Sequence, residues 1–431
     1  MRVRPLLSAS LALSLILALA VPSLAAPKIR RMSVRSNGTD HVGDSDVPDI
    51  TPSGRYVVFA SSAELIPADM NTNVDIYLRD QRKKKTRLLS MRSDGSIEPS
   101  GNSEHPSISA SGRFVAFESS GELIPGDGYP GSDIYLRDRT KRKTILVSRR
   151  SNGSQADQAS YAPAISADGR FVAFQTTSKL AGKDTNGAAD IYVRDLAKKK
   201  TRLVSASASG QVGDGESFDA AISADGRFVA FASNSSDLVP TDGNGAADIF
   251  VKDMKTRRIR RVSVRSNGAE GTDPSHDPQI SANGRWVVFA SESLLAGQDV
   301  GAFRNVFVHD RKTRKTRLAS KSSAGATATC ASPGSITGLD ISPDGRWVAF
   351  DSCADNLGNP MGNYSVYLHD RVKGRTRLVS RRNGGGISPD TNEQPVVSRG
   401  GLFVAWTSDD EMIVGGDSNT SDDVFRWGPR K

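Results

Sequence analysis

The phrase ISADGRFVAF, at residues 165–174, is the pattern on which the whole chain is built. It occurs seven times in recognisable form at intervals of 56 to 61 residues, for example as ISPDGRWVAF at residues 341–350. In each copy, two short apolar segments flank a turn that contains glycine. Glycine adopts the positive φ that such a turn requires without steric cost. Each copy therefore predicts a β-hairpin.

Two further phrases recur with the hairpin. A strand-like phrase such as DIYVRD, at 190–195, follows about sixteen residues later and also occurs seven times. A third phrase, such as TRLVS at 201–205, comes after a basic turn but follows its partner only six times. The missing copy stands at the start of the chain, because IRRMSVRSNG at 29–38 matches IRRVSVRSNG at 259–268 at nine of ten positions.

Six complete units and one unit assembled from both ends of the chain predict a closed ring. We therefore expect an all-β fold over residues 26–431: a single seven-bladed β-propeller of four-stranded antiparallel blades, its last blade closed by the N-terminal strand. Closure pairs the strand edges that an open array would expose. Cys330 precedes the first strand of the sixth unit and Cys353 follows its second strand, so both lie at the same face and a disulfide is predicted.

Residues 1–25 have the three parts of a signal peptide. A cationic start is followed by an apolar run and then by small residues that include Ser23 and Ala25. No later apolar stretch is long enough to cross a membrane. We therefore predict a secreted or periplasmic protein that does not span the membrane and is a monomer.

The phrases ISPDGRWVAF and ISADGRFVAF, followed by DIYVRD, resemble the WD40-like (PD40) repeats of TolB-type β-propellers over residues 28–428. The resemblance implies an exported scaffold that binds a protein or an envelope polymer, and it leaves the ligand open. The N-terminal α/β domain of TolB and the hydrolase domain of related peptidases are not expected here. We predict that the protein is not an enzyme. The alternative is a secreted propeller enzyme of the polysaccharide lyase or lactonase type, with its site at the channel mouth.

Residues just before the first strand of each unit vary from unit to unit, although the core positions repeat. A varied polar and aromatic set at a concave mouth is typical of a ligand site. Neutral drift in loops gives the same variation, so both interpretations stay open. The candidate ligand-binding residues are Glu104, His105, Tyr161, Phe218, Asp219, His276, Asp277 and Glu393.

Three loops between the second and third strands of a unit carry oxygen side chains in the spacing that Ca²⁺ favours. The alternative is an Asx-turn, in which Asp or Asn binds its own backbone. No other cofactor is expected. The candidate Ca²⁺ ligands are Asp69, Asn71, Asn73, Asp75, Asp184, Asn186, Asp190, Asp242, Asn244 and Asp248.

In the six units whose third strand is followed by a fourth strand, the turn between these two strands is basic. They hold 27 of the 57 Lys and Arg residues, for example in QRKKKTR at 81–87. Strand alternation places these turns on one face and the Asp-rich loops on the other. The basic face predicts an anionic envelope polymer as partner, whereas solubility and edge protection are the competing explanation. Nucleic acid is not predicted, because aromatic residues are not interleaved with the basic ones.

Overall fold

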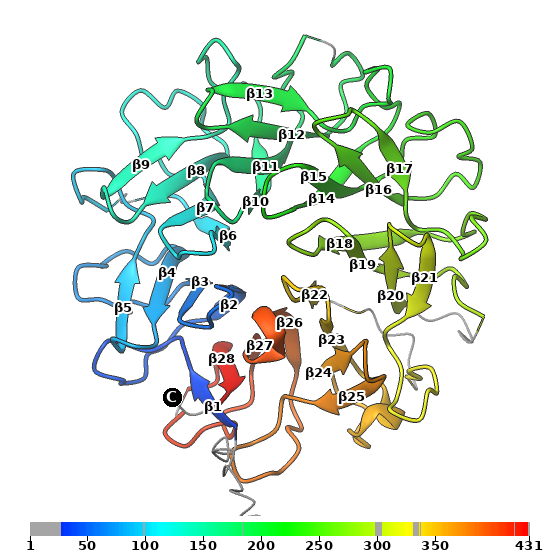
Figure 1. The fold of residues 1–431 in the computed structure, drawn as a ribbon. Coiled ribbons are helices and arrows are strands. Elements are labelled where there is room, and N and C mark those ends of the chain that lie inside the picture. Colours follow the sequence, from blue (N-terminus) through cyan, green and yellow to red (C-terminus); the bar gives the residue numbers. More distant parts are fainter. Residues whose placement is uncertain are drawn as a thin grey trace, which may run out of the picture.

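The chain folds as a ring of seven four-stranded antiparallel sheets in the computed structural model (Figure 1). This confirms the predicted seven-bladed propeller. The predicted signal peptide lies outside the described part of the chain. The structure describes residues 27–97, 100–182, 184–297, 304–330, 336, 338–417 and 419–429.

Each blade runs from an innermost strand at the ring axis to an outermost strand at the rim. The strands are, for blade 1, β2 (Ser45–Ile50), β3 (Tyr56–Ser61), β4 (Asp75–Asp80) and β5 (Lys85–Leu88); blade 2, β6 (Ser103–Ile108), β7 (Phe114–Ser119), β8 (Asp133–Asp138) and β9 (Lys143–Leu146); blade 3, β10 (Ser160–Ile165), β11 (Phe171–Thr176), β12 (Asp190–Asp195) and β13 (Lys200–Leu203); blade 4, β14 (Ser217–Ile222), β15 (Phe228–Ser233), β16 (Asp248–Asp253) and β17 (Ile259–Arg261); blade 5, β18 (Ser275–Ile280), β19 (Trp286–Ser291), β20 (Asn305–Asp310) and β21 (Lys315–Leu318); blade 6, β22 (Leu339–Ile341), β23 (Trp347–Ser352), β24 (Ser365–Asp370) and β25 (Arg375–Leu378); and blade 7, β26 (Asn392–Val397), β27 (Val404–Ser408), β28 (Asp423–Gly428) and β1 (Lys28–Arg31). Two short 3₁₀ helices, η1 (Asp355–Leu357) and η2 (Arg399–Gly401), lie in blades 6 and 7.

The repeated letters of the hairpin phrase each have a structural use. Gly112 has φ of 72° and lies under the ring of Tyr56 from the preceding blade, where a Cβ atom would collide with the ring. The Arg113 guanidinium covers the ring of Phe114 at 4.6 Å and donates two hydrogen bonds to Asp138, at the end of the third strand. The phrase therefore joins a hairpin to its own blade and to its neighbour. The same arginine–aspartate pair occurs as Arg55–Asp80, Arg170–Asp195, Arg227–Asp253, Arg285–Asp310 and Arg346–Asp370.

The hydrophobic core is divided into layers between neighbouring blades. Val58 and Leu78 of blade 1, for example, pack against Val115 and Phe117 of blade 2, and all four side chains are fully buried. The Phe117 ring stacks on Tyr135 in the next strand of its own blade, with ring centroids 6.1 Å apart. Each blade therefore depends on both neighbours for burial of its apolar side chains.

The ring is closed by the N-terminal strand, as predicted. Strand β1 pairs antiparallel with β28, with Arg31 opposite Phe425, so the blue and red ends of the chain meet in one sheet (Figure 1). Ile29 and Met32 are buried at this junction. Just beyond the strand, the Met32 backbone N–H donates to the carbonyl of Val424 at 2.6 Å. The first and last described strands are therefore neighbours.

Cys330 and Cys353 form the predicted disulfide. It closes a 23-residue separation between the segment before blade 6 and the end of β23. Replacing both cysteines with serine is expected to lower the free energy of unfolding by about 2–4 kcal/mol, because the unfolded chain gains freedom. Urea unfolding of the oxidised protein and the variant measures this difference. Two free thiols in the unreduced, denatured protein would contradict the pairing.

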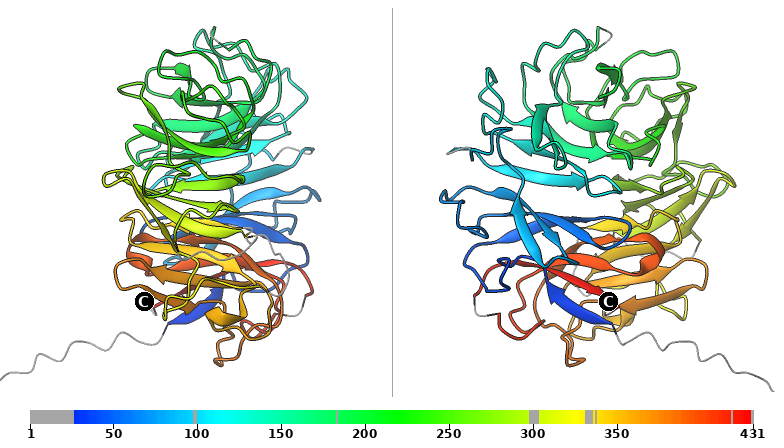
Figure 2. Two further views of the ribbon diagram at one scale, coloured as in Figure 1. Left: turned by 90° about the vertical axis from the view of Figure 1, so that its right-hand side faces the viewer. Right: turned by 60° about the vertical axis from the view of Figure 1, so that its left-hand side comes forward.

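Connecting loops gather on the two faces of the ring, as the side views show (Figure 2). The hairpin turns and the basic turns lie at one end of the strands, and we call this end the basic face. The loops after the second and fourth strands lie at the other end, which we call the acidic face. In the portion of the chain that is described, no helix has both the length and the apolar character needed to cross a membrane.

Candidate functional site

The innermost strands of all seven blades line one cavity of 430 Å³ on the ring axis. Six of these strands contain a bulge at a residue other than glycine whose φ lies between 45° and 54°. Such φ values are uncommon for residues with a side chain, and bulges redirect the side chains beside them. The cavity lining therefore includes three of the predicted ligand residues, His105, Asp219 and Asp277. The six bulge residues are Val47, His105, Ala162, Asp219, Asp277 and Gln394.

Side chains from neighbouring blades accept several of the bulge N–H groups. Glu118 accepts the N–H of Ala162 at 2.7 Å, and Asp351 accepts that of Gln394 at 3.1 Å. The Gln394 side chain in turn accepts the N–H of Val47 at 2.9 Å. We did not predict Glu118 or Asp351, although VAFES and VAFDS place an acid where the other units have Ala, Gln or Thr. These two acids tie adjacent blades together at the channel.

His105 and Glu118 form an ion pair on one side of the mouth. The His105 Nδ1 atom lies 3.1 Å from Glu118 Oε1. This hydrogen bond raises the pKa of His105, against the effect of burial, and the charge of Glu104 adds to the increase. Ligand atoms of Glu104, His105 and Glu118 lie within 4.8 Å of one another, so this group could hold a metal ion. The arrangement therefore favours the protonated form of the imidazole.

A second group lies on blades 4 and 5. Burial raises the pKa of Asp277 to about 6, and the nearby Asp219 carboxylate contributes to the increase. The His276 ring stacks on Phe218 with centroids 6.4 Å apart. Burial lowers the pKa of His276, and the charge of Arg304 lowers it further. Near neutral pH, a neutral imidazole and a carboxyl group close to its titration point therefore occupy the same part of the mouth.

The two remaining candidates stand on other blades. Tyr161 lies on β10 and is 45% exposed. Glu393 lies on β26, opposite Thr407 in the sheet. The structure thus places the eight predicted residues at the start of the inner strands of blades 2, 3, 4, 5 and 7. It brings His105 together with Glu104, and Asp219 with Phe218, His276 and Asp277.

The predicted Ca²⁺ loops lie on the acidic face, and their Asn and Asp residues have different roles. The side-chain oxygen of Asn71 accepts the N–H of Asn73, and those of Asn186 and Asn244 accept the N–H two residues further on, which is Asx-turn geometry. By contrast, the side chains of the aspartates that open and close each loop are buried. They are Asp69 with Asp75, Asp184 with Asp190, and Asp242 with Asp248.

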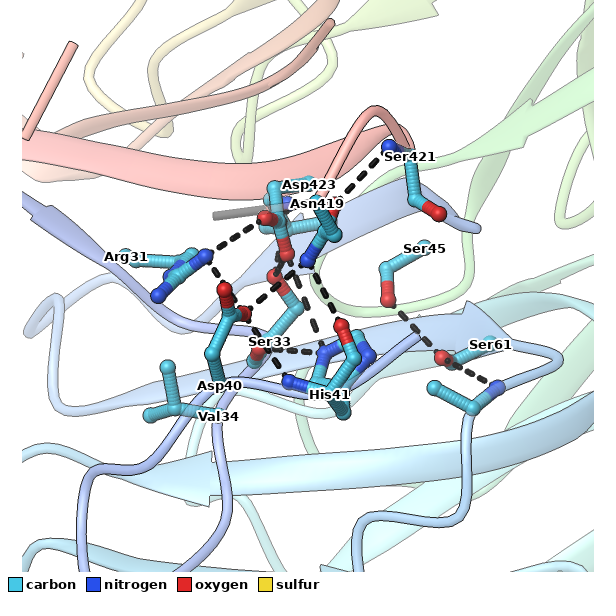
Figure 3. Close-up of polar contacts among 12 residues, drawn as sticks. Arg31, Ser33, Val34, Asp40, His41, Ser45, Ser61, Asn419, Ser421 and Asp423 are labelled. Carbon is cyan, nitrogen blue, oxygen red and sulfur yellow. Dashed lines mark hydrogen bonds and ion pairs between the residues drawn. The ribbon is translucent and has the colours of Figure 1, made fainter. Parts of the chain in front are cut away.

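A third group of acids lies near the ring closure and surrounds Arg31, as Asp242, Asp248 and Glu270 of blade 4 surround Arg261. Arg31 Nη1 contacts Asp40 at 2.6 Å, Asp417 at 2.7 Å and Asp423 at 3.0 Å, and Figure 3 shows Arg31 beside Asp40 and Asp423. The Ser33 hydroxyl also donates to Asp423. Sequence reasoning placed no site here. The signal was available in IRRMS and IRRVS, which have Arg31 and Arg261 where the other units have leucine.

The basic face carries exposed lysine and arginine side chains around the rim. A groove of 710 Å³ between blades 4 and 5 is lined by Arg227, Arg258, Arg260, Arg311 and Arg314, among others. A second groove, of 440 Å³, lies between blades 1 and 2. It contains four arginines in addition to apolar side chains, namely Arg87, Arg137, Arg139 and Arg142. Cationic grooves therefore recur between neighbouring blades.

Solved structures similar to this chain include oligogalacturonate lyases and TolB. An oligogalacturonate lyase in complex with manganese matches with a TM-score of 0.53 and 13% identity, over 95% of each chain. An oligogalacturonate lyase from Vibrio parahaemolyticus matches with a TM-score of 0.55 and 14% identity, over 94% of this chain and 96% of that one. TolB from Acinetobacter baumannii matches with a TM-score of 0.41 and 17% identity, over 78% of this chain. This chain spans 63% of that TolB chain.

The likeness to the two lyases defines the class of this chain by its fold alone, as a β-propeller. No family model matches the chain, and no curated protein matches it. The prediction that the protein is not an enzyme is wrong as an inference from this fold. That prediction relied on the absence of a hydrolase domain. The match to this propeller, however, covers 95% and 96% of the two lyase chains, which leaves almost no room for such a domain in them. Catalysis and binding are both compatible with the architecture.

Proposed function

We propose that this protein is exported and binds an anionic polymer across its basic face. The observation that supports the proposal is the ring of exposed cations over six blades, together with the arginine-lined grooves between them. The aspartates at the ends of the third strands are each matched by one hairpin arginine. Among the described residues, the lysines of the basic turns form no ion pair, so their charge is available to a polyanion.

Backbone strain at the basic turns favours a role beyond solubility. Lys84, Arg142, Lys199, Arg257 and Arg314 have φ between 51° and 62°, which side chains rarely adopt. Blade 6 has Gly374 at the equivalent place, with φ of 64°, so glycine fits this turn. Five turns therefore keep a cation where glycine would relieve strain. An acidic polysaccharide is a fitting ligand, and the oligogalacturonate lyases share this fold.

The turn lysines of blades 1 and 3 provide the test. Replacing Lys83, Lys84 and Lys85 with glutamine should lower the salt concentration that elutes the protein from a polygalacturonate column. Adding the same change at Lys198–Lys200 should lower it again, because screening limits each contact to its own turn. The control is Lys179→Gln, at an exposed lysine on the acidic face. Wild-type protein that does not bind the column even at low salt would overturn the proposal.

The second candidate function is catalysis at the channel mouth, of the polysaccharide lyase or lactonase type. It is favoured by the neutral His276 beside Asp277, because a general base must be deprotonated at the working pH. Screening purified protein against acidic polysaccharides and lactones tests this candidate. Turnover that His276→Ala or Asp277→Asn abolishes, while column binding is unchanged, would support it. A wild type without turnover on these substrates would count against it.

A further inference from the structure

We propose that blades 1 and 3 each bind a calcium ion between two buried aspartates, at the place where blades 4 and 7 hold an arginine. This site is separate from the basic face and from the channel mouth. The inference comes from comparing the same pair of carboxyl groups in five blades. In blade 1 the pair is Asp69 and Asp75, and in blade 3 it is Asp184 and Asp190.

The common framework of the pair is clearest at its second aspartate. In blades 1 to 4 and 7 a serine of the outermost segment donates its hydroxyl to the first carboxyl oxygen, Oδ1. The second oxygen, Oδ2, is left facing the other aspartate of the pair. The serine–aspartate bonds are Ser90–Asp75, Ser148–Asp133, Ser205–Asp190, Ser263–Asp248 and Ser33–Asp423.

In blade 4 a guanidinium nitrogen lies between the two aspartates. Arg261 Nη1 is 3.1 Å from Asp242 Oδ1 and 2.9 Å from Asp248 Oδ2, and it also contacts Glu270. Arg31 does the same with Asp417 and Asp423 in blade 7. A positive charge therefore balances the buried carboxylates in both blades.

In blade 2 an amide nitrogen takes the same place. Gln155 Nε2 donates to Asp127 Oδ1 and, at 2.8 Å, to Asp133 Oδ2. The Tyr135 hydroxyl donates to the other oxygen of Asp127. Blade 2 therefore has a tyrosine and a glutamine where blade 4 has Phe250 and an arginine.

Blades 1 and 3 have the tyrosine but neither nitrogen donor. Tyr77 donates to Asp69 Oδ2, and Tyr192 to Asp184 Oδ2. The arginine position is Leu88 in blade 1, which pairs with Tyr77 as Arg261 pairs with Phe250. The glutamine position is Ile97, which forms the same isolated bridge as Gln155. The corresponding residues of blade 3 are Leu203 and Val212.

The oxygens left over in these two blades are the ones that bind nitrogen elsewhere. Asp69 Oδ1 and Asp75 Oδ2, and likewise Asp184 Oδ1 and Asp190 Oδ2, are buried and lack a hydrogen bond of normal geometry, with the side chains of Asn71 and Asn186 near Asp75 and Asp190. The four residues are between 0% and 4% exposed. A buried carboxylate is costly unless it is paired or binds a metal. A ligand set made only of oxygens, with two carboxylates, suits Ca²⁺ among the common metal ions.

Calcium titration of chelator-treated, full-length protein tests the proposal by calorimetry and by thermal melting. The wild type should bind about two ions per chain and melt at a higher temperature with Ca²⁺ than without it. Asp75→Asn and Asp190→Asn should each remove about one ion, and the double variant should lose the thermal response to Ca²⁺. Asparagine is tolerated at this position, since Asn305 of blade 5 accepts the equivalent serine hydroxyl.

Two further variants keep the test decisive. Asp133→Asn is the matched control, because Gln155 already fills that pair, and it should leave the Ca²⁺ stoichiometry unchanged. Arg261→Leu empties a third pair and should add about one ion. Wild-type protein that binds no Ca²⁺, or a double variant that binds as much as the wild type, would overturn the inference. Neither result depends on polymer binding by the basic face.

Discussion

Protein that begins at residue 37 is expected to aggregate, or to melt far below protein that begins at residue 26. The shortened chain lacks β1 and leaves β28 as an open edge. It also loses three buried side chains, Ile29, Met32 and Val34, each of which stabilises the fold by about 1.5–3 kcal/mol. Thermal melting and size-exclusion chromatography of the two proteins measure the effect.

Point variants separate the loss of the strand from the loss of chain length. Ile29→Ser combined with Met32→Ser keeps the backbone of β1 but removes its apolar contacts. The melting temperature of this variant should therefore lie between those of the proteins that begin at residues 26 and 37. Lys28→Gln, at an exposed side chain of the same strand, is the control and should melt like the wild type. Equal melting temperatures for the proteins beginning at 26 and 37 would show that the ring does not need this strand.

Arg261→Leu is expected to cost about 3–5 kcal/mol of unfolding free energy in the presence of a chelator. The substitution leaves the carboxylates of Asp242, Asp248 and Glu270 close together without their cation, and the first two are almost fully buried. Removing one partner of a buried ion pair leaves an uncompensated charge, which is the costly case. Urea unfolding of the variant and the wild type gives the difference directly.

The neighbouring residue supplies the control for this prediction. Arg260→Leu changes an exposed arginine on the same strand and should alter the unfolding free energy little. A second change, Asp248→Asn in the Arg261→Leu chain, should recover part of the loss because it removes one of the buried charges. If Arg261→Leu and Arg260→Leu are equally stable, the cluster is not held by its arginine.

The fold could be predicted from the sequence because its parts repeat. The turn glycine and the arginine–aspartate pair recur with nearly constant spacing, and each copy strengthens the assignment of the others. Ring closure followed from one missing strand, and the disulfide from the positions of Cys330 and Cys353 in a single unit. Each of these conclusions needs only the order of strands within a blade, which the phrases give directly.

The contacts of the candidate site were harder to predict, because they are made between blades by residues that break the repeat. Glu118 and Asp351 are acids at a position where the other units have Ala, Gln or Thr. Only the structure shows that they accept the N–H groups of bulge residues in the next blade. His309 and His369 replace the Arg or Lys of the equivalent strands, a change that by itself does not predict burial. Both are buried against threonines, and burial lowers the pKa of each to about 4.

The pairing of β1 with β28 also sets an order on folding. The first strand to leave the ribosome is the last to find its partner, which lies nearly four hundred residues later in the chain. Contacts of such long sequence separation form slowly and carry a large loop-closure entropy. Until residue 428 is available, six complete blades can assemble only as an arc, with β1 unpaired and the apolar faces of the two terminal blades uncovered. Such surfaces are prone to aggregation during synthesis. The native state is therefore reached in a single late step that depends on the whole chain.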